Sequence, residues 1–285
     1  MHWVNSISIV LPTEEKLLPL VLHVFSHEVS HAWLGLKIRP SSFEKKELSW
    51  FLEGFNDYLA LTLALQSGFI NESQYFKVMN KYLNLYTLSP LKALSIKDFE
   101  SIEYHSMDYF SIETIKGHLL AKKLVENAQG IGFKAFSEAL KELVINSKDE
   151  RLNTKMIENA FSQFFTQETL QTFIQKHSSN IDFPQTDNIA TLRPKKVLSP
   201  HLDFDTTELY YENRISEVAT GSNAYKAGLR NGQKVVSFHI PFLSPNPKFE
   251  FIIEEKENVI QKKIAYFPKM SKVTIQQYEL KSRNE

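Results

Sequence analysis

The sequence predicts a multi-domain α + β protein, in which a mainly helical domain is followed by a small β-rich domain. Apolar residues recur at helical spacing from about 47 to 180, and a proline-containing stretch with few periodic apolar residues follows. Beyond that stretch, strand-like alternation replaces the helical period. We therefore expect a helical domain at 1–180, a linker or extended segment at 181–204 and the β-rich domain at 205–285.

The composition is that of an ordinary globular protein. The chain has 285 residues, 42% of them hydrophobic, and 33 basic residues balance 33 acidic ones. A balanced charge gives no reason to expect nucleic acid or an anionic membrane as partner, and no apolar run reaches the length of a membrane span. The absence of cysteine excludes disulfides and thiolate metal ligands. No signal peptide is evident, so we expect a cytoplasmic location, although export stays open if the N-terminus is truncated. The sequence does not indicate the oligomeric state.

The first domain is expected to begin with a strand at 6–10 and a helix at about 13–36. Gly68, Pro90 and Gly130 each follow a periodic segment and act as stop signals. Further helices are expected at 47–66, 71–86, 96–102, 111–128, 132–146, 153–165 and 166–177.

The β-rich domain is expected to contain short strands separated by turn residues. A short helix between the first two strands is indicated by the pattern at 223–229. The strands are expected at 214–218, 234–240, 249–254 and 260–267.

The segment His27-Glu28-Val29-Ser30-His31 carries the clearest chemistry. Residues four apart lie on one face of a helix, so His27 and His31 can direct their imidazoles at one point, with Glu28 beside it. Two neutral imidazoles suit zinc, and a nearby carboxylate can take a proton from a zinc-activated water. This is the H-E-x-x-H pattern of zinc-dependent peptidases, although both histidines could instead be ordinary polar positions on a half-buried helix. We expect His27 and His31 as metal ligands and Glu28 as catalytic base.

A second cluster, around Glu53 and Asp57, supplies what a zinc site still needs. Such sites use three or four protein ligands, and Glu53 on a crossing helix is the expected third. Asp57 follows one turn later and is expected to accept the free ring N–H of His27, fixing its tautomer. His23 precedes His27 by one turn. It is either an additional ligand or substrate contact or, as we favour, a hydrogen-bonded histidine packed behind the site.

These clusters resemble the gluzincin metallopeptidases, on the residues His27–Trp33, Gly35 and Trp50–Gly54. Within that group the chain is most similar to the glycyl aminopeptidase family, on Lys37–Pro40 and Glu53–Tyr58. The resemblance implies a gluzincin-type catalytic domain, Zn2+ as cofactor and a peptide substrate with a small N-terminal residue. Relatives carry a long β-rich region before the zinc helix, so the chain resembles the C-terminal part of such an enzyme. Whether it would act as an exopeptidase or an endopeptidase stays open.

The expected oxyanion donor departs from the family pattern. Related enzymes place a tyrosine near a Lys-Gly pair, where it donates a hydrogen bond to the tetrahedral intermediate. Lys116-Gly117 is present, but the residue three positions before Gly117 is Thr114. Tyr109 is the candidate replacement, with Tyr104 as an alternative; otherwise Tyr109 is a packed aromatic. Two functions therefore stay open: an active zinc peptidase, or a catalytically weak or inactive zinc-binding relative that serves as a scaffold.

The C-terminal domain resembles a PDZ domain, on Ala227-Gly228-Leu229 and the following Asn231-Gly232-Gln233. Glycyl aminopeptidases of the matched family carry such a module at this end. PDZ domains capture peptides by strand addition and hold the terminal carboxylate with backbone N–H groups of a glycine-rich loop. The corresponding stretch, about 202–210, has acidic residues and no glycine. We therefore favour a packing or regulatory module over a peptide receptor.

Overall fold

The structure is a computed structural model. It describes residues 18–32, 34, 38, 48–101, 107–127, 132–147, 151–162, 164, 166–168, 189–241, 244, 246–256 and 260–281. Among these, the side chains at 18–20, 93, 99–101, 107–111, 127, 256 and 260 are not described. The strand predicted at 6–10 and most of the helix predicted at 166–177 lie outside the described residues.

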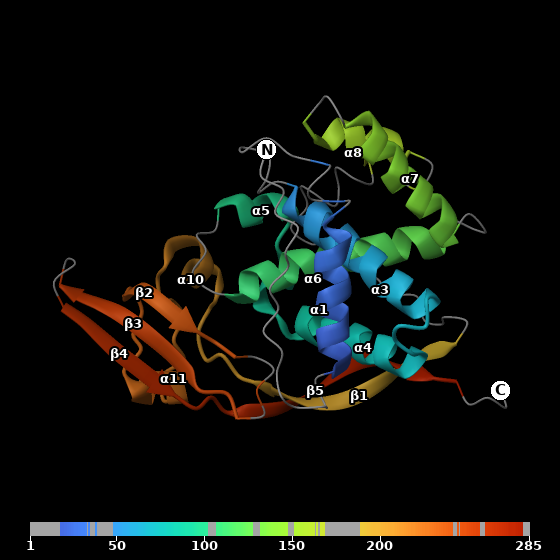
Figure 1. Cartoon of the computed structure of the whole chain (residues 1–285). Helices are drawn as coiled ribbons and strands as arrows, with labels where there is room; N and C mark the ends of the chain where they lie inside the picture. The colour runs from blue at the N-terminus through green and yellow to red at the C-terminus, as the bar shows by residue number, and fades with distance from the viewer. Residues whose placement is uncertain are drawn as a thin grey trace.

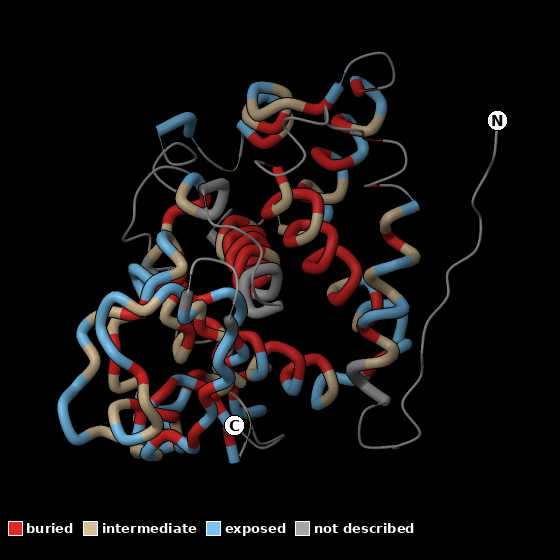
Figure 2. The backbone as a smooth tube through the Cα atoms, turned by 90° about the vertical axis from the view of Figure 1, so that its left-hand side faces the viewer, coloured by how far each residue is buried: buried red, intermediate tan, exposed pale blue. Residues whose placement is uncertain are grey.

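The N-terminal half of the described chain is helical, with α6 running through its middle (Figure 1). Almost every position of α6 from 112 to 122 is buried, and Figure 2 shows long runs of buried positions in this part of the molecule. Its elements are α1 (Leu18–Ser30), the π-helix η2 (Trp50–Phe55), α3 (Asn56–Gln66), α4 (Glu72–Leu88), the 3-10 helix η3 (Pro90–Ala93), α5 (Ile96–Ser101), α6 (Met107–Asn127), α7 (Gly132–Asn146) and α8 (Thr154–Ala160).

The described helices lie where they are predicted, with larger differences at three ends. α6 begins at Met107, before the predicted start at 111, and α8 ends at Ala160, before the predicted end at 165. α7 begins and ends where its pattern predicts, and α4 extends two residues further. The helix predicted to run to residue 36 ends instead at Ser30. Its last turn tightens, because the N–H of Ala32 donates to the carbonyl of Val29, three residues back, as in a 3-10 turn. None of the helices in the described ranges has the length and apolar character needed to cross a membrane.

Two glycines let η2 and α6 cross with their backbones in contact. A Cβ built on Gly117 would lie 1.9 Å from the carbonyl oxygen of Trp50, and one built on Gly54 would lie 2.5 Å from Cα of Gly117. Real Cβ atoms do not approach backbone so closely, so neither position has room for a side chain. The Lys-Gly pair singled out in the sequence thus holds a helix crossing, one residue away from Glu53 on the partner helix.

Aromatic side chains form the core beneath this crossing. The ring of Phe55 lies 5.5 Å from that of Trp50, 5.6 Å from Phe136 in α7 and 5.4 Å from Phe161 after α8. Edge-to-face and tilted pairs at these distances are favourable arrangements for aromatic rings. The core therefore packs η2 against α7 and the residue that follows α8.

The C-terminal part contains a two-stranded ribbon and a three-stranded antiparallel sheet. In the ribbon β1 pairs with β5, from Ala190 opposite Leu280 to Pro200 opposite Met270. In the sheet β3 lies between β2 and β4. The elements are β1 (Ala190–Pro200), α10 (Thr207–Glu212), α11 (Asn223–Ala227), β2 (Lys234–His239), β3 (Phe249–Lys256), β4 (Ile260–Tyr266) and β5 (Met270–Leu280).

The ribbon lies against α4 and so joins the two parts of the chain (Figure 1). The side-chain amide of Asn80 donates to the carbonyl of Tyr278 at 2.9 Å and accepts from its N–H at 2.7 Å. One turn later, Asn84 accepts from the amide of Gln277 at 2.9 Å. Asn80 thus occupies the free edge of β5 as a neighbouring strand would.

The structure refines one prediction for the C-terminal part, a linker or extended segment at 181–204, and contradicts another. The predicted linker contains β1, a paired strand whose alternation is masked by two prolines and two lysines. The strand predicted at 214–218 is wrong, because the structure has only isolated bridges there, from Ser216 to Asp205 and from Arg214 to Lys234. Glu217 adopts a positive φ of 51°, which interrupts an extended strand.

The Ala-Gly-Leu motif closes α11. Gly228 has a φ of 106°, a conformation that favours glycine, and its N–H donates to the carbonyl of Tyr225. The N–H of Leu229 donates to the carbonyl of Ala224, and both of these side chains are buried. The motif therefore has a local structural role in this chain, which is to end α11.

Replacing Gly117 by alanine should destabilise the fold through the η2–α6 crossing. We expect Gly117→Ala to lower the free energy of unfolding by about 2–3 kcal/mol, because overpacking outweighs the gain in helix propensity. Gly68→Ala is the matched control, since its Cβ would have no neighbour within 4 Å but its φ is +74°. It should cost about 1 kcal/mol. Urea denaturation measures both, and a Gly117→Ala protein as stable as the wild type would contradict the close crossing.

Candidate metal centre

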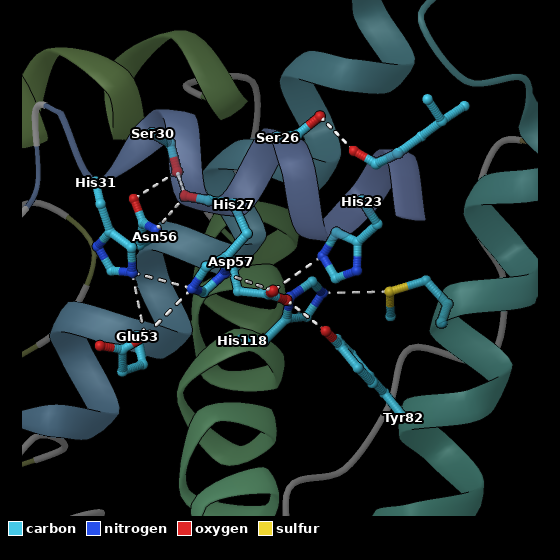
Figure 3. A network of polar contacts seen from close by, with 12 residues as sticks. His23, Ser26, His27, Ser30, His31, Glu53, Asn56, Asp57, Tyr82 and His118 are labelled. Carbon is cyan, nitrogen blue, oxygen red and sulfur yellow. Dashed lines mark hydrogen bonds and ion pairs between the residues drawn. The ribbon is translucent and has the colours of Figure 1, made fainter. Parts of the chain in front are cut away.

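Two nitrogen atoms and one oxygen atom converge where α1 faces η2. Nε2 of His27 lies 3.0 Å from Nε2 of His31, and Oε2 of Glu53 lies 3.2 Å from each of them (Figure 3). Atoms that share one tetrahedral zinc ion, each about 2.0–2.1 Å from it, are about 3.3 Å apart. Among the residues that the structure describes, these three form the one group of this kind. The triangle therefore fits a single small cation.

The chemistry of the three atoms also fits a cation. A carboxylate oxygen and the unprotonated nitrogen of a neutral imidazole present only lone pairs, which repel one another at this distance unless positive charge lies between them. Either a proton on one ring or a bound metal ion can supply that charge. Histidine nitrogen and carboxylate oxygen are both ordinary zinc ligands.

His27 and His31 keep helical spacing although α1 ends between them. The N–H of His31 donates to the carbonyl of His27 at 3.3 Å, the bond that an intact helix would make. Their rings lie 4.7 Å apart at 83°, so the two Nε2 atoms point to a common position. The predicted convergence of the two imidazoles is present.

Glu53 belongs to the π-helix, a feature that the sequence pattern does not reveal. The sequence predicts a continuous α-helix over 47–66, but Trp50–Phe55 form a π-helix, whose backbone hydrogen bonds join residues five apart instead of four. Short π-segments often occur at functional sites. Here the π-turn contains the third ligand candidate directly before Gly54, the residue that contacts α6.

The cluster is buried on the side of Asp57 and exposed to solvent on the side of Glu53. The exposed fraction of the side chain rises from 4% for Asp57 to 14% for His27, 23% for His31 and 40% for Glu53. Glu28, between the two histidines in α1, is exposed to solvent. Water can therefore reach the ligand atoms from the side of Glu53 and His31, while the carboxylate behind His27 is sealed from it.

Asp57 lies behind His27, where the sequence placed it. Its Oδ1 is 2.9 Å from Nδ1 of His27. An ionised carboxylate only accepts hydrogen bonds, so Nδ1 must carry the hydrogen and Nε2 of the neutral ring is left with its lone pair toward Glu53. His23 is buried, and its Nε2 lies 2.9 Å from the same oxygen in an ion-pair contact outside hydrogen-bond geometry. His23 thus lies behind the site and is not part of the three-residue group.

The close contacts of the cluster raise the pKa of His27 and lower the pKa values of Glu53 and Asp57, so that each shift favours the charged form. Burial lowers the pKa of His27, but the hydrogen bonds and charges of Asp57 and Glu53 outweigh it and raise the pKa from 6.5 to about 10. Burial raises the pKa of Glu53, but its contacts with His27 and His31 lower it to about 2. Burial likewise raises the pKa of Asp57, yet the neighbouring histidines hold it well below 3.8. Both carboxylates are therefore ionised, and the site is poised to receive positive charge.

Asn56 and Ser30 fasten α1 to α3, a role that sequence reasoning missed. The fully buried amide of Asn56 donates to the carbonyl of His27 at 3.1 Å. The hydroxyl of Ser30 lies 2.6 Å from Oδ1 of Asn56 and 2.7 Å from the same carbonyl. The backbone of His27, the first ligand candidate, is thus fixed by the residue that precedes Asp57. The only sequence signal is a polar residue on a face that is otherwise apolar.

Tyr82 and His118 also escaped the sequence analysis. Tyr82 in α4 and His118 in α6 both contact Oδ2 of Asp57. His118 directly follows Lys116-Gly117, so its place next to the family's Lys-Gly motif is a sequence signal for a role at the site. Tyr82 carries no such signal, because it reads as an ordinary aromatic on the apolar face of a helix.

The predicted oxyanion donors cannot be placed at the centre. Tyr109 is in the first turn of α6, but its side chain lies outside the described part, and Tyr104 lies outside it altogether.

Lys116 is buried and donates to the carbonyl of Leu94. Burial lowers its pKa to about 8, although Asp98 acts in the opposite direction.

Comparison with protein families gives one match. Residues 20–114 match the family model described as M61 glycyl aminopeptidase. The matched segment contains both histidines, Glu28, Glu53 and Asp57, and it ends before Lys116 and the C-terminal part. No curated protein matches the chain.

Zinc binding should be coupled to proton release. The metal-free protein holds a proton on His27 at neutral pH because the pKa is raised to about 10, whereas a ligand must be unprotonated. Affinity should therefore rise with pH, by about tenfold per unit between about pH 6 and 9, with about one proton released per ion. Titration calorimetry in two buffers of different ionisation enthalpy measures this release.

The matched control is His201→Ala, which removes an exposed histidine paired with Asp203 at 2.6 Å in the C-terminal part. This variant should bind zinc with unchanged affinity and unchanged proton release, whereas His27→Ala should lose binding. An affinity independent of pH would show that the ion does not displace a proton from His27.

Proposed function

Because the match over residues 20–114 supports membership of the chain in the M61 glycyl aminopeptidase family, we propose that it is a zinc-dependent peptidase. The observation that carries the proposal is the triangle formed by Nε2 of His27, Nε2 of His31 and Oε2 of Glu53, with edges of 3.0–3.2 Å. A purely structural zinc site would have no need of a carboxylate at Glu28, the second residue of the H-E-x-x-H pattern.

In this proposal each residue has one task. His27, His31 and Glu53 hold the ion, and Asp57 keeps His27 in the ligating tautomer. When bound, zinc would supply a Lewis acid for the substrate carbonyl and lower the pKa of water at its open position. Glu28 takes the proton of the attacking water and passes it to the leaving amine.

The mechanism also needs a donor of a hydrogen bond to the oxyanion of the tetrahedral intermediate. We propose Tyr109 for it, since Thr114 stands where related enzymes have a tyrosine. Loss of one such donor typically slows turnover by about 100- to 1,000-fold. An enzyme in which no tyrosine replaces it should therefore bind zinc normally and turn over slowly.

The family suggests a peptide substrate with a small N-terminal residue such as glycine. The residues that recognise a free amine in aminopeptidases belong to a region before the zinc helix, so exopeptidase action is a separate matter from hydrolysis itself. Cleavage of N-terminally blocked peptides would identify an endopeptidase with the same centre, whereas cleavage restricted to free N-termini would identify an aminopeptidase.

The domain division is also a proposal. We assign catalysis to residues 1–180 and a PDZ-like module to residues 205–285. The ribbon of β1 and β5, which lies on α4, joins the module to the helices that carry the centre. This attachment, and the acidic stretch without glycine at 202–210, favour a packing or regulatory role for the module.

Thr114 supports a second candidate function, a zinc-binding scaffold with weak or no activity. Both candidates share the metal site, so metal content cannot separate them. A panel of aminoacyl dyes and peptides can. Stoichiometric zinc without turnover on any of these substrates would favour the scaffold.

Glu28→Gln is the direct test of the peptidase. The amide cannot accept the proton, so we expect hydrolysis to fall by at least about 100-fold while zinc content stays near one ion per chain. Glu53→Gln is the matched control, because it changes a ligand and should lose zinc together with activity. Full activity in Glu28→Gln would exclude Glu28 as the base.

A further inference from the structure

The second oxygen of the Asp57 carboxylate has two partners of its own. Oδ2 accepts a hydrogen bond from the hydroxyl of Tyr82 at 2.9 Å and lies 2.7 Å from Nδ1 of His118. Tyr82 comes from α4 and His118 from α6, whereas His27, which faces Oδ1, comes from α1 (Figure 3). One carboxylate of α3 thus connects three other helices, with the metal ligand on one oxygen and two donors on the other.

The orientation of this carboxylate decides which nitrogen of His27 carries the hydrogen. While Oδ1 faces Nδ1, the ring keeps its hydrogen there and offers Nε2 to a metal. If the carboxylate turned about its Cβ–Cγ bond, Nδ1 would lose its acceptor. The tautomer with the hydrogen on Nε2, which cannot bind a metal, would then become competitive.

We propose that Tyr82 and His118 are positioning residues of the metal centre, which hold Oδ2 of Asp57 so that Oδ1 stays directed at Nδ1 of His27. The inference rests on the proposed zinc site and adds two residues that act on the ligand His27 through Asp57. The roles follow from contacts in this chain, and His118 lies beyond residue 114, where the family match ends.

Packing prevents the two donors from moving away. His118 is fully buried, and its ring lies 5.0 Å from the ring of Tyr82 and 5.5 Å from that of Tyr58, edge-on in both cases. Its other nitrogen, Nε2, faces the sulfur of Met79 at 3.3 Å. The ring is therefore enclosed on both sides, with Nδ1 directed at Asp57.

Tyr82→Phe tests the hydroxyl at nearly constant volume. We expect zinc affinity to fall about 10-fold, at the lower end of the 10- to 100-fold range for groups behind the ligands. Competition with a chromophoric chelator measures this without any substrate. Tyr58→Phe is the matched control, because it removes the hydroxyl of another buried tyrosine whose ring packs edge-on against His118 and leaves the contacts of Asp57 intact. It should change zinc affinity by less than about twofold.

His118 can be tested by loss and rescue. His118→Leu removes the donor and should weaken zinc binding by about 10- to 100-fold. The side-chain amide of His118→Asn can donate from nearly the same place as Nδ1, so this variant should recover most of the affinity. A role in packing alone would predict the opposite order, since leucine fills an apolar site better than asparagine.

A double-mutant cycle shows whether Tyr82 acts through Asp57. In an Asp57→Asn background the acceptor that Tyr82 orients is already altered, so adding Tyr82→Phe should have almost no further effect on zinc affinity. Independent losses that simply multiply would mean that Tyr82 does not act through this carboxylate.

The outcomes separate this inference from the proposed function. A wild-type protein that binds no zinc overturns both. A wild type that binds zinc, with Tyr82→Phe no weaker than Tyr58→Phe, overturns the positioning role alone. A selective loss in Tyr82→Phe, rescue by His118→Asn and a non-additive cycle support it, whatever the substrate proves to be.

Discussion

The buried carboxylate of Asp57 contacts side chains from three other helices, α1, α4 and α6. Removing a carboxylate from water is costly unless nearly all of its hydrogen-bonding capacity is met. Here the carboxylate of Asp57 has hydrogen-bond contacts at 2.7–2.9 Å with His27, His118 and Tyr82. Nε2 of His23 lies a further 2.9 Å from Oδ1 without hydrogen-bond geometry. Any packing of α1, α3, α4 and α6 that failed to bring these groups together would leave a buried charge without partners. The helical arrangement and the geometry of the metal centre therefore depend on the same interaction.

The contacts of Asp57 also depend on the close crossing of η2 and α6 at Gly54 and Gly117. Because Gly54 and Gly117 have no side chains, η2 and α6 approach to backbone contact. The neighbours of these glycines, Glu53 and His118, contact His27 and Asp57 respectively. The aromatic core around Phe55 supports η2 from behind. Glu53, the proposed third ligand, is thus held on a π-turn between a packed core and a close helix crossing, and such rigid support is what a metal site requires.

The parts of the centre that could be predicted are those with local spacing. His27 and His31 share a helix face because they are four apart, and Asp57 follows Glu53 by one turn, so one helical period placed each pair. Nothing local indicates Tyr82, which only tertiary packing brings to the centre. The same limit applies to the fold. β1 pairs with β5 across some eighty positions of sequence, and its prolines and lysines hide the alternation. The strand predicted at 214–218 is interrupted by the backbone of Glu217, which its side chain does not indicate.

Anomalous diffraction at the zinc absorption edge, on crystals of the zinc-loaded full chain, tests the central claim most directly. The account predicts one strong peak about 2 Å from Nε2 of His27, Nε2 of His31 and a carboxylate oxygen of Glu53, with Oδ1 of Asp57 still in contact with Nδ1 of His27. A peak bound by other residues, or Glu53 turned away from the two imidazoles, would contradict it.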